Sequence, residues 1–419
     1  MAATKTDIWV YAHWKGMEDP KCIGIISAQQ SKGSRIFGFE YNKEWLKSDH
    51  LFLLDPEIGL FSGTQYPEKK DNFGVFMDSM PDTWGRTLML RRAAQKALAK
   101  EEAAAKLYEI DFLLGVHDAS RMGALRFKLD PDGPFLDDNK ENPTPPITHL
   151  RKLEASVKAY EEDEDGKNGN EWIPMLFAPG SSLGGARPKA NIVDLDGHLY
   201  IAKFPSKSDT TDKAAWEYLA YELACKAGIN MPICKLEKAR GPYHTFLSRR
   251  FDREARERIH FASAMTMTKN SEDSIRDATP SYLEIADFIQ TYGSNIEEDL
   301  HQLWRRIIFN MAISNTDDHF RNHGFLLTEK GWRLSPAYDI NPSIDKNGLA
   351  LNVDMHNNAL DFELALSVGK FFQLKEEQMH RIIKEVSIAV KDWRTLGAKL
   401  GIPRAEQEIM SPAFSLVTI

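Results

Sequence analysis

The stretch Ser314-Asn-Thr-Asp-Asp-His-Phe-Arg-Asn322-His-Gly-Phe-Leu-Leu327 holds more polar side chains than a protein core would bury without a reason. Two aspartates, two histidines and two asparagines fall within residues 315–323, directly after an apolar helical segment and before a short apolar strand. A second polar segment, Leu334-Ser-Pro-Ala-Tyr-Asp339-Ile-Asn, follows the next predicted strand. Together the two segments indicate a functional site.

The spacing of Asp317, Asn322 and Asp339 is typical of phosphoryl transfer. A carboxylate base comes first, an amide ligand for magnesium follows five residues later, and a second carboxylate ligand lies one hairpin further on. Oxygen ligands of this kind suit a hard cation that keeps waters and phosphate oxygens as its other ligands. Two alternatives stay open: Asp317 and Asp318 could cap a helix or turn, or they could serve a metallohydrolase together with His319 and His323. The metallohydrolase interpretation lacks the spaced HxH or HExxH pairs that place two imidazoles on one metal.

A glycine-containing segment, Gly180-Ser-Ser-Leu-Gly-Gly-Ala-Arg-Pro-Lys189, precedes a predicted hairpin formed by residues 189–194 and 198–204. Adjacent glycines allow several backbone N–H groups to face one anion, and Lys189 adds positive charge. It is not a Walker A loop, and taken alone such a segment is more often a surface turn than a phosphate site.

Lys203 lies in the apolar strand Tyr200-Ile-Ala-Lys-Phe-Pro, where a lysine is costly unless an anion meets it or the side chain turns to solvent. Glu217, on a helix predicted over 212–227 and ended by Gly228, could fix that lysine or lie on a solvated face. A glycine segment, a strand lysine, a helical glutamate, Asp-x4-Asn and a later aspartate follow one another in the order seen in protein kinases. The ordered set is more informative than any one of its members.

Composition restricts the class of protein. The 419 residues carry a net charge of −8, which argues against a large nonspecific nucleic-acid surface. The three cysteines form no CxxC pair, so a disulfide framework and a four-cysteine zinc site are excluded. No run of 18 apolar residues and no apolar signal core occur, and we therefore expect a cytoplasmic protein without membrane contact.

The chain is predicted to be β-rich over about the first 75 residues and strongly helix-forming from Thr83 to Leu107. The acidic run Glu161–Asp165 is interpreted as a surface connector with no assigned role. After Ser281 the chain is mostly helical, apart from two short strands near residues 324–327 and 332–334.

Several motifs resemble those of the HipA family, the serine/threonine kinase toxins of bacterial toxin–antitoxin modules. From residue 182 onward the matching stretches are Ser182-Leu-Gly-Gly-Ala-Arg-Pro-Lys, Ile201-Ala-Lys-Phe-Pro, Glu217 with Leu223-Ala and Ala227-Gly-Ile, Arg250-Phe-Asp-Arg, Asn315-Thr-Asp-Asp-His-Phe-Arg-Asn and Pro336-Ala-Tyr-Asp. Before residue 182 they are Phe37-Gly-Phe-Glu-Tyr, Pro81-Asp-Thr-Trp-Gly-Arg and Gly123-Ala-Leu-Arg-Phe, so the resemblance covers nearly the whole chain.

The resemblance implies an α+β, protein-kinase-like two-lobed fold with a β-rich N-terminal subdomain and a large helical C-terminal lobe. The expected division is 1–115 for the β-rich subdomain, 116–252 for the nucleotide-binding lobe with glycine-rich loop and hinge, and 253–419 for the helical lobe with the catalytic loop. It departs from some family members at Arg249, where they carry glutamate, and in a short hairpin between Lys189 and Lys203.

The resemblance also implies residue roles. Asp317 would be the general base, Asn322 and Asp339 would hold Mg²⁺, and Lys203 would contact the phosphates of ATP. Ser182 would be the site of an autophosphorylation that expels the phosphate loop. The remaining residues expected at the nucleotide are Gly184, Gly185, Ala186, Arg187, Pro188 and Lys189 over the phosphates, Arg249, Arg250 and Phe251 as the hinge, and His319, Phe320, Arg321 and Tyr338, with His319 also assigned to the catalytic group.

The implied function is an ATP-dependent protein kinase toxin that inhibits growth, with an aminoacyl-tRNA synthetase as the characteristic class of substrate. The implied partner is a HipB-like helix-turn-helix antitoxin that supplies most of the contact with DNA. Two alternatives are a catalytically silent nucleotide-binding subunit of a transcriptional repressor complex and a small-molecule phosphotransferase of kinase-like fold.

Overall fold

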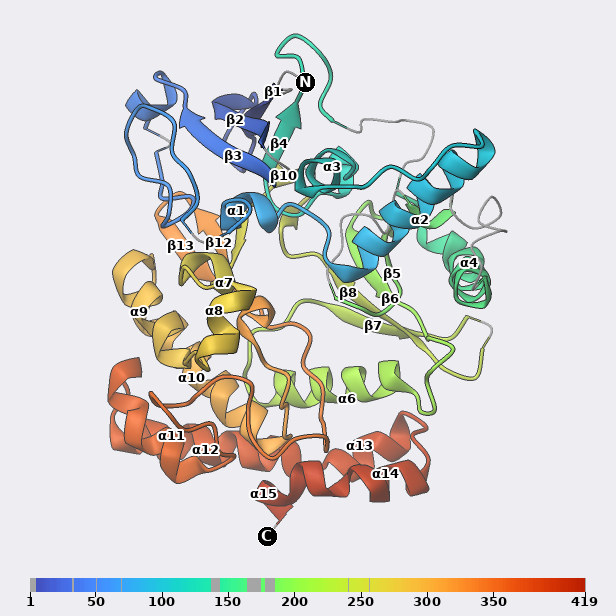
Figure 1. Ribbon diagram of the computed structural model, residues 1–419. Helices are drawn as coiled ribbons and strands as arrows, with labels where there is room; N and C mark the ends of the chain where they lie inside the picture. Colours follow the sequence, from blue (N-terminus) through green and yellow to red (C-terminus); the bar gives the residue numbers. More distant parts are fainter. Residues whose placement is uncertain are drawn as a thin grey trace. The chain divides into compact units, whose positions relative to one another are not determined.

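The computed structural model describes residues 5–31, 34–49, 51–68, 70–136, 144–163, 175–177, 185–239, 241–255 and 257–418. The chain divides into two compact units, and Figure 1 labels the helices and strands that belong to them. The first consists of Met1–Ser208 and Asp252–Ala262, and the second of Asp209–Phe251 and Ser263–Ile419. The expected three-part division stays a prediction.

An antiparallel sheet opens the first unit, with strand order β3-β2-β1-β4. Its strands are β1 (Lys5–Ala12), β2 (Lys21–Ser31), β3 (Ser34–Tyr41) and β4 (Leu125–Lys128). Alternation along β1 buries Ile8, Val10 and Ala12 completely, as expected for a sheet with one face toward a core. The predicted β-rich start of the chain is therefore present.

Helices, a hairpin and a two-stranded ladder complete the first unit. They are η1 (Trp45–Lys47), α1 (Gly74–Met77), α2 (Thr83–Ala99), α3 (Glu109–Leu114), η2 (Asp118–Ser120), η3 (Ile147–His149), α4 (Leu150–Glu162), the hairpin of β5 (Lys189–Val193) and β6 (Leu199–Lys203), and the ladder of β9 (Arg253–Glu254) and β10 (Glu257–Arg258). The predicted hairpin is observed. The helix expected up to Leu107 instead ends at Ala99, because Glu101 takes a left-handed backbone with φ of 57°.

The acidic run was wrongly interpreted at its start. Glu161 and Glu162 belong to α4, and Glu161 holds the turn after β6: its carboxylate accepts hydrogen bonds from Ser206 Oγ (2.5 Å) and from the backbone N–H of Lys207 (2.7 Å). Most of the rest of the run lies outside the described residues.

The second unit begins with α6 (Lys213–Lys226), which Asp212 caps and Gly228 follows with φ of 76°. The hairpin of β7 (Cys234–Glu237) and β8 (Thr245–Arg249) packs against α6. β11 (Phe261–Ser263) contains the boundary at which the chain leaves the first unit, after Ala262, and enters the second.

The remaining elements are mostly helical, as the sequence predicted. They are α7 (Ala264–Met267), α8 (Glu272–Asp277), α9 (Tyr282–Tyr292), α10 (Ile296–Ala312), η4 (Phe320–Asn322), β12 (Gly324–Thr328), β13 (Gly331–Leu334), α11 (Phe362–Val368), η5 (Gly369–Phe372), α12 (Glu376–Lys391), α13 (Trp393–Lys399), α14 (Arg404–Met410), η6 (Ser411–Phe414) and α15 (Ser415–Thr418).

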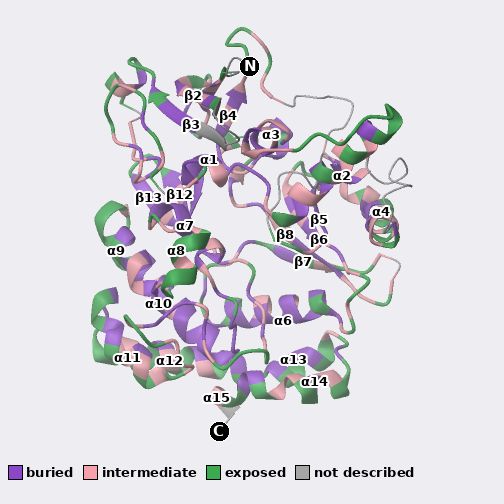
Figure 2. Ribbon diagram, viewed as in Figure 1, coloured by how far each residue is buried: buried purple, intermediate pink, exposed green. Residues whose placement is uncertain are grey.

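Helix α10 forms the centre of this unit. Leu303, Trp304, Ile307 and Ile308 are fully buried, and α9, α11 and α12 pack around the helix (Figure 2). Burial of this apolar surface holds α10 in place. It therefore also fixes where the polar segment that begins at Ser314 leaves the helix. Among the described residues, no helix combines the length and the apolar character that crossing a bilayer requires.

Candidate active site

The polar segment begins with a change of chain direction after α10. Ser314 has a φ of 50°, a left-handed conformation that is unusual for a residue other than glycine. Two hydrogen bonds hold it there: Ser314 Oγ donates to the carbonyl of Ala413 (2.9 Å), and Ser343 N–H donates to the carbonyl of Ser314 (3.1 Å). Asp339 has a φ of 57°, so both polar segments contain a strained residue, as functional sites often do.

Asp318 is the buried member of the aspartate pair. Its Oδ2 accepts hydrogen bonds from the Tyr282 hydroxyl (2.6 Å) and from Asn310 Nδ2 (2.7 Å), and it lies 2.8 Å from His323 Nε2. These contacts join the polar segment to α9, to α10 and to the start of β12. A buried carboxylate is tolerated when donors surround it, and here it fixes the backbone of its neighbours.

Arg306 extends this buried network. Burial lowers the pKa of Arg306 to about 10, although the charges of Asp318 and Asp299 act in the opposite direction. Burial first, and then the charge of Asp318, raise the pKa of Tyr282 well above its ordinary value. Arg306 also donates to the carbonyl of Ser335 (2.5 Å), so it is bonded to the second polar segment while its charge interacts with Asp318 in the first.

Asp317 is the exposed member of the pair, with 78% of its side chain accessible. Its backbone carbonyl accepts hydrogen bonds from His319 N–H and from Asn322 Nδ2, both at 3.0 Å, while Lys346 Nζ lies 4.0 Å from its carboxylate. The buried aspartate thus holds the loop, and the exposed one presents a carboxylate to whatever binds there.

Asn322 and Asp339 lie on segments that flank the β12–β13 hairpin. Ser335 N–H donates to the carbonyl of Gly324 (2.8 Å), and the Tyr338 hydroxyl donates to the carbonyl of Arg321 (2.7 Å), so the two flanks run next to each other. The amide nitrogen of Asn322 is engaged with Asp317, which leaves its side-chain oxygen as the atom able to ligate a cation. With the exposed Asp339 carboxylate, this oxygen set fits Mg²⁺.

Other predicted nucleotide contacts occupy the same unit. The rings of Phe251 and Tyr338 pack with centroids 5.5 Å apart, and Arg249 N–H donates to the carbonyl of Ile233 (2.8 Å). Arg250 and Phe320 are buried, while Arg321 is paired with Glu272 (2.9 Å). Burial gives Phe320 a packing role in the core, in addition to the predicted one at the nucleotide.

The glycine segment lies in the first unit, where residues 185–189 are described; Ser182 and Gly184 lie outside the described residues. Gly185 has a φ of 74°, and a Cβ built on it would be 2.6 Å from Lys189 Nζ, so the ammonium group lies against the backbone of the segment. Arg187 donates weakly to the carbonyl of Phe204 (3.5 Å), and the carbonyl of Pro188 accepts from Phe204 N–H (2.9 Å).

Lys189 and Lys203 are directly opposite each other on β5 and β6. Residues opposite each other in an antiparallel pair place their side chains on the same face, with Cβ atoms about 5 Å apart. Two positively charged side chains therefore belong to one face of the hairpin. The register, together with the ammonium group beneath Gly185, makes this face suited to an anion.

Sequence reasoning missed a structural use of the Arg-Phe-Asp-Arg motif. Asp252 accepts hydrogen bonds from Gly123 N–H (2.8 Å) and Arg253 Nη1 (2.6 Å), and Arg253 donates to the carbonyl of Arg121 (2.7 Å). The second half of the motif therefore ties residues 252–262 to the strand that begins at Leu125. Arg250-Phe-Asp-Arg and Gly123-Ala-Leu-Arg-Phe are both motifs of the family that the chain resembles. Their joint presence, rather than their spacing along the chain, was the signal in the sequence for this contact.

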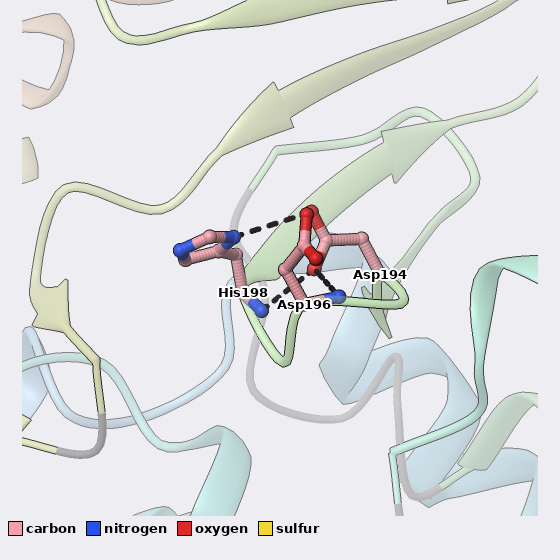
Figure 3. Close-up of side chains that lie close together, drawn as sticks. All are labelled: Asp194, Asp196 and His198. Carbon is pink, nitrogen blue, oxygen red and sulfur yellow. Dashed lines mark hydrogen bonds and ion pairs between the residues drawn. The ribbon is translucent and has the colours of Figure 1, made fainter.

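One group of metal-type side chains in the described part of the chain brings at least three ligand atoms within 4.8 Å of one another: Asp194, Asp196 and His198 (Figure 3). The trio forms the turn of the β5–β6 hairpin, where Asp194 Oδ1 accepts from the N–H groups of Asp196 (3.0 Å) and His198 (2.8 Å). Partial burial raises the pKa of Asp194, but the hydrogen bonds from His198 outweigh it and the pKa is lowered. These hydrogen bonds within the turn account for the closeness of the three side chains without a metal ion.

Lys203 and the glycine segment belong to the first unit, whereas Asp317, Asn322 and Asp339 belong to the second. Their convergence on one nucleotide, and the pairing of Lys203 with Glu217, stay predictions. Within the second unit, the engagement of His323 with Asp318 gives that imidazole a structural task, which disfavours the metallohydrolase interpretation.

The chain belongs to the HipA-like C-terminal domain family, whose family model matches residues 181–393. A protein named "Putative kinase" from Haemophilus influenzae is 26% identical over 179 residues, which cover 38% of this chain and 52% of the relative. "Putative kinase Y4mE" from Sinorhizobium fredii is 22% identical over 248 residues, covering 53% and 51%. The chain thus spans about half the length of these curated relatives.

A solved structure with a similar fold is the HipA chain in the complex of HipA, HipB and operator DNA from Shewanella oneidensis MR-1. The TM-score is 0.64 at 17% identity, and the match covers 98% of this chain and 95% of that chain. This likeness confirms the predicted α+β, kinase-like fold of HipA type.

Proposed function

We propose that this protein is a serine/threonine protein kinase that transfers the γ-phosphate of ATP to a protein substrate and acts as a growth-inhibiting toxin. The observation that carries the proposal is the division of labour between adjacent aspartates. Asp318 is buried beneath the loop, and Asp317 is exposed beside Asn322. Catalysis of phosphoryl transfer comes mostly from positioning. A catalytic loop with a fixed backbone and an accessible carboxylate suits that task.

In this proposal Asp317 accepts the proton of the attacking hydroxyl. Its carboxylate can reach a substrate because it is exposed, and it is positioned because its own carbonyl is held by His319 and Asn322. A positioned general base contributes about 10²–10⁴ in rate. Exposure also suits a protein substrate, whose hydroxyl must approach from solvent.

The phosphates of ATP are assigned to the face formed by Gly185, Lys189 and Lys203. The opposed lysines supply positive charge, and the missing side chain of Gly185 leaves room for phosphate oxygens. Asn322 and Asp339 would hold Mg²⁺, which offsets phosphate charge when bound. The tilted rings of Phe251 and Tyr338 offer aromatic surface for the base.

Regulation and partners follow from the resemblance. We assign autophosphorylation to Ser182, a HipB-like antitoxin as the partner that contacts DNA, and an aminoacyl-tRNA synthetase as the substrate class. Similarity of fold to a HipA chain from a complex with HipB and operator DNA supports the choice of partner. Phosphate on Ser182 would add about −1.5 to −2 charges to a segment suited to anions, and would compete with ATP.

The test is Mg²⁺-dependent ATP turnover and self-phosphorylation by the full chain, compared with Asp317→Asn. Wild type should turn over ATP and carry phosphate on Ser182 by mass spectrometry, while the variant should bind ATP without turnover. Nucleotide binding with no turnover in wild type would favour the silent regulatory subunit instead. Turnover that phosphorylates small molecules but no protein would favour a small-molecule phosphotransferase.

A further inference from the structure

The start of α2 is bonded to the glycine segment at three places. Asp82 Oδ2 accepts from Gly185 N–H (3.2 Å), Trp84 N–H donates to the carbonyl of Gly185 (3.0 Å), and the Trp84 indole N–H donates to the carbonyl of Lys189 (2.7 Å). About 100 residues separate the two segments along the chain. Both belong to the first unit.

These bonds arise from ordinary helix-end chemistry used in an unusual way. The first N–H groups of a helix have no partner within the helix, and a side chain before it usually satisfies one of them. Here Asp82 caps Thr83 N–H (2.8 Å), and the carbonyl of Gly185 satisfies the next donor, Trp84 N–H. The glycine segment is therefore part of the cap of α2.

The cap also sets the direction of the peptide group after Gly185. In a trans peptide the C=O and the following N–H point in opposite directions. Because the carbonyl of Gly185 is aimed at α2, the N–H of Ala186 is aimed away from it. The Gly185 N–H, by contrast, is taken by Asp82 and is withdrawn from any anion.

Trp84 is suited to a fixed role. Its side chain is 3% exposed, and its ring packs edge-on against Tyr160 at 5.0 Å between centroids. Its indole N–H therefore points at Lys189 from a rigid base, and Lys189 is the residue whose ammonium group lies under Gly185.

We propose that Asp82 and Trp84 form a latch that holds residues 185–189 in the conformation that receives ATP phosphates. Both are positioning residues, and both lie outside the region 181–393 that matches the family model. The part of this inference that concerns ATP affinity rests on the proposed function. The part that concerns the conformation of the segment does not.

Two substitutions in the full chain separate the latch from general stability. Trp84→Phe keeps an aromatic ring against Tyr160 and removes the indole donor. Asp82→Ser keeps a helix-capping hydroxyl and is too short to reach Gly185 N–H. Thr87→Ala is the matched control, since Thr87 lies one turn further along α2 and its hydroxyl donates to the carbonyl of Thr83 rather than to Asp82 or Trp84.

Hydrogen–deuterium exchange of the peptide that contains residues 185–190, measured without nucleotide, reports on the latch directly. Loss of one hydrogen bond should accelerate exchange there about fivefold. The KM for Mg·ATP should rise about fivefold while kcat changes less than twofold, because the affected groups position the segment and do no chemistry. Thr87→Ala should match wild type in both measurements.

Unchanged exchange at residues 185–190 in both Trp84→Phe and Asp82→Ser would overturn the latch. So would faster exchange with an unchanged KM, because the segment would then be held without consequence for ATP. If Trp84→Phe fails to fold, Asp82→Ser decides. If wild type shows no ATP turnover, the proposed function is wrong, and nucleotide-free exchange still decides whether the latch exists.

Discussion

The hydroxyl of Tyr282 donates a 2.6 Å hydrogen bond to Oδ2 of Asp318, from a helix that ends before α10 begins. Both residues are buried, and the same oxygen also accepts a hydrogen bond from Asn310 Nδ2. The bond places a structural carboxylate immediately beside the exposed Asp317. It follows that the loop's shape depends on a residue 36 positions away.

Tyr282→Phe should lower the free energy of unfolding by about 1.5–3 kcal/mol, because a hydrogen bond to a buried charge is lost. Urea denaturation measures this. Tyr292→Phe is the control: Tyr292 is 44% exposed, so its change should be within about 0.5 kcal/mol. Equal stability of the two variants would contradict the anchoring role of Asp318.

Adjacent aspartates should respond to the same substitution in opposite ways. Asp317→Asn should reduce ATP turnover at least about 10²-fold and leave stability within about 0.5 kcal/mol, because the side chain is exposed. Asp318→Asn should destabilise by about 3–5 kcal/mol, since it turns an amide toward Tyr282, Asn310 and His323. Paired denaturation and turnover curves test both; a folded, active Asp317→Asn protein would refute the assignment of the base.

Part of this site was readable from the sequence, because Asp317, Asn322 and Asp339 lie close together along the chain. Tyr282, Asn310 and Arg306 were missed, since nothing local marks which helical residue will face Asp318. The contacts of Asp82 and Trp84 with Gly185 and Lys189 were missed for the same reason. Glu161 looked like part of a solvated acidic run because its partners, Ser206 and Lys207, come 45 and 46 residues later. Periodicity and turn chemistry predict elements; they do not predict long-range pairing.

Gly185→Ala should weaken Mg·ATP binding at least about tenfold, because its Cβ would be 2.6 Å from Lys189 Nζ and would displace that ammonium group. Gly197→Ala provides a control for backbone strain. Its φ of 85° is also left-handed, yet nothing lies within 4 Å of a Cβ there. Calorimetric titration with Mg·ATP should show the loss in the first variant alone, and equal affinities would count against an anion face at Gly185.

Asp55 should make stability depend on pH independently of the site. Burial raises the pKa of Asp55 to about 6, although the N–H groups of Glu57 and Val75 act to lower it. Between its ordinary pKa of 3.8 and about 6, the folded protein binds more protons at this group than the unfolded chain does. The stability that this group contributes is therefore present below pH 3.8 and is lost as the pH rises through about 6.

Asp55→Asn removes that titration, so unfolding free energy measured in urea should fall less steeply, or rise more steeply, from pH 4 to pH 6.5 than in wild type. The variant should also be less stable overall, because an amide cannot accept at both of its side-chain atoms and one of the two backbone donors loses its partner. Asp130→Asn is the control, since Asp130 is exposed and accepts from a neighbour in its own turn. Parallel pH profiles for wild type and Asp55→Asn would show that Asp55 titrates normally in the folded protein.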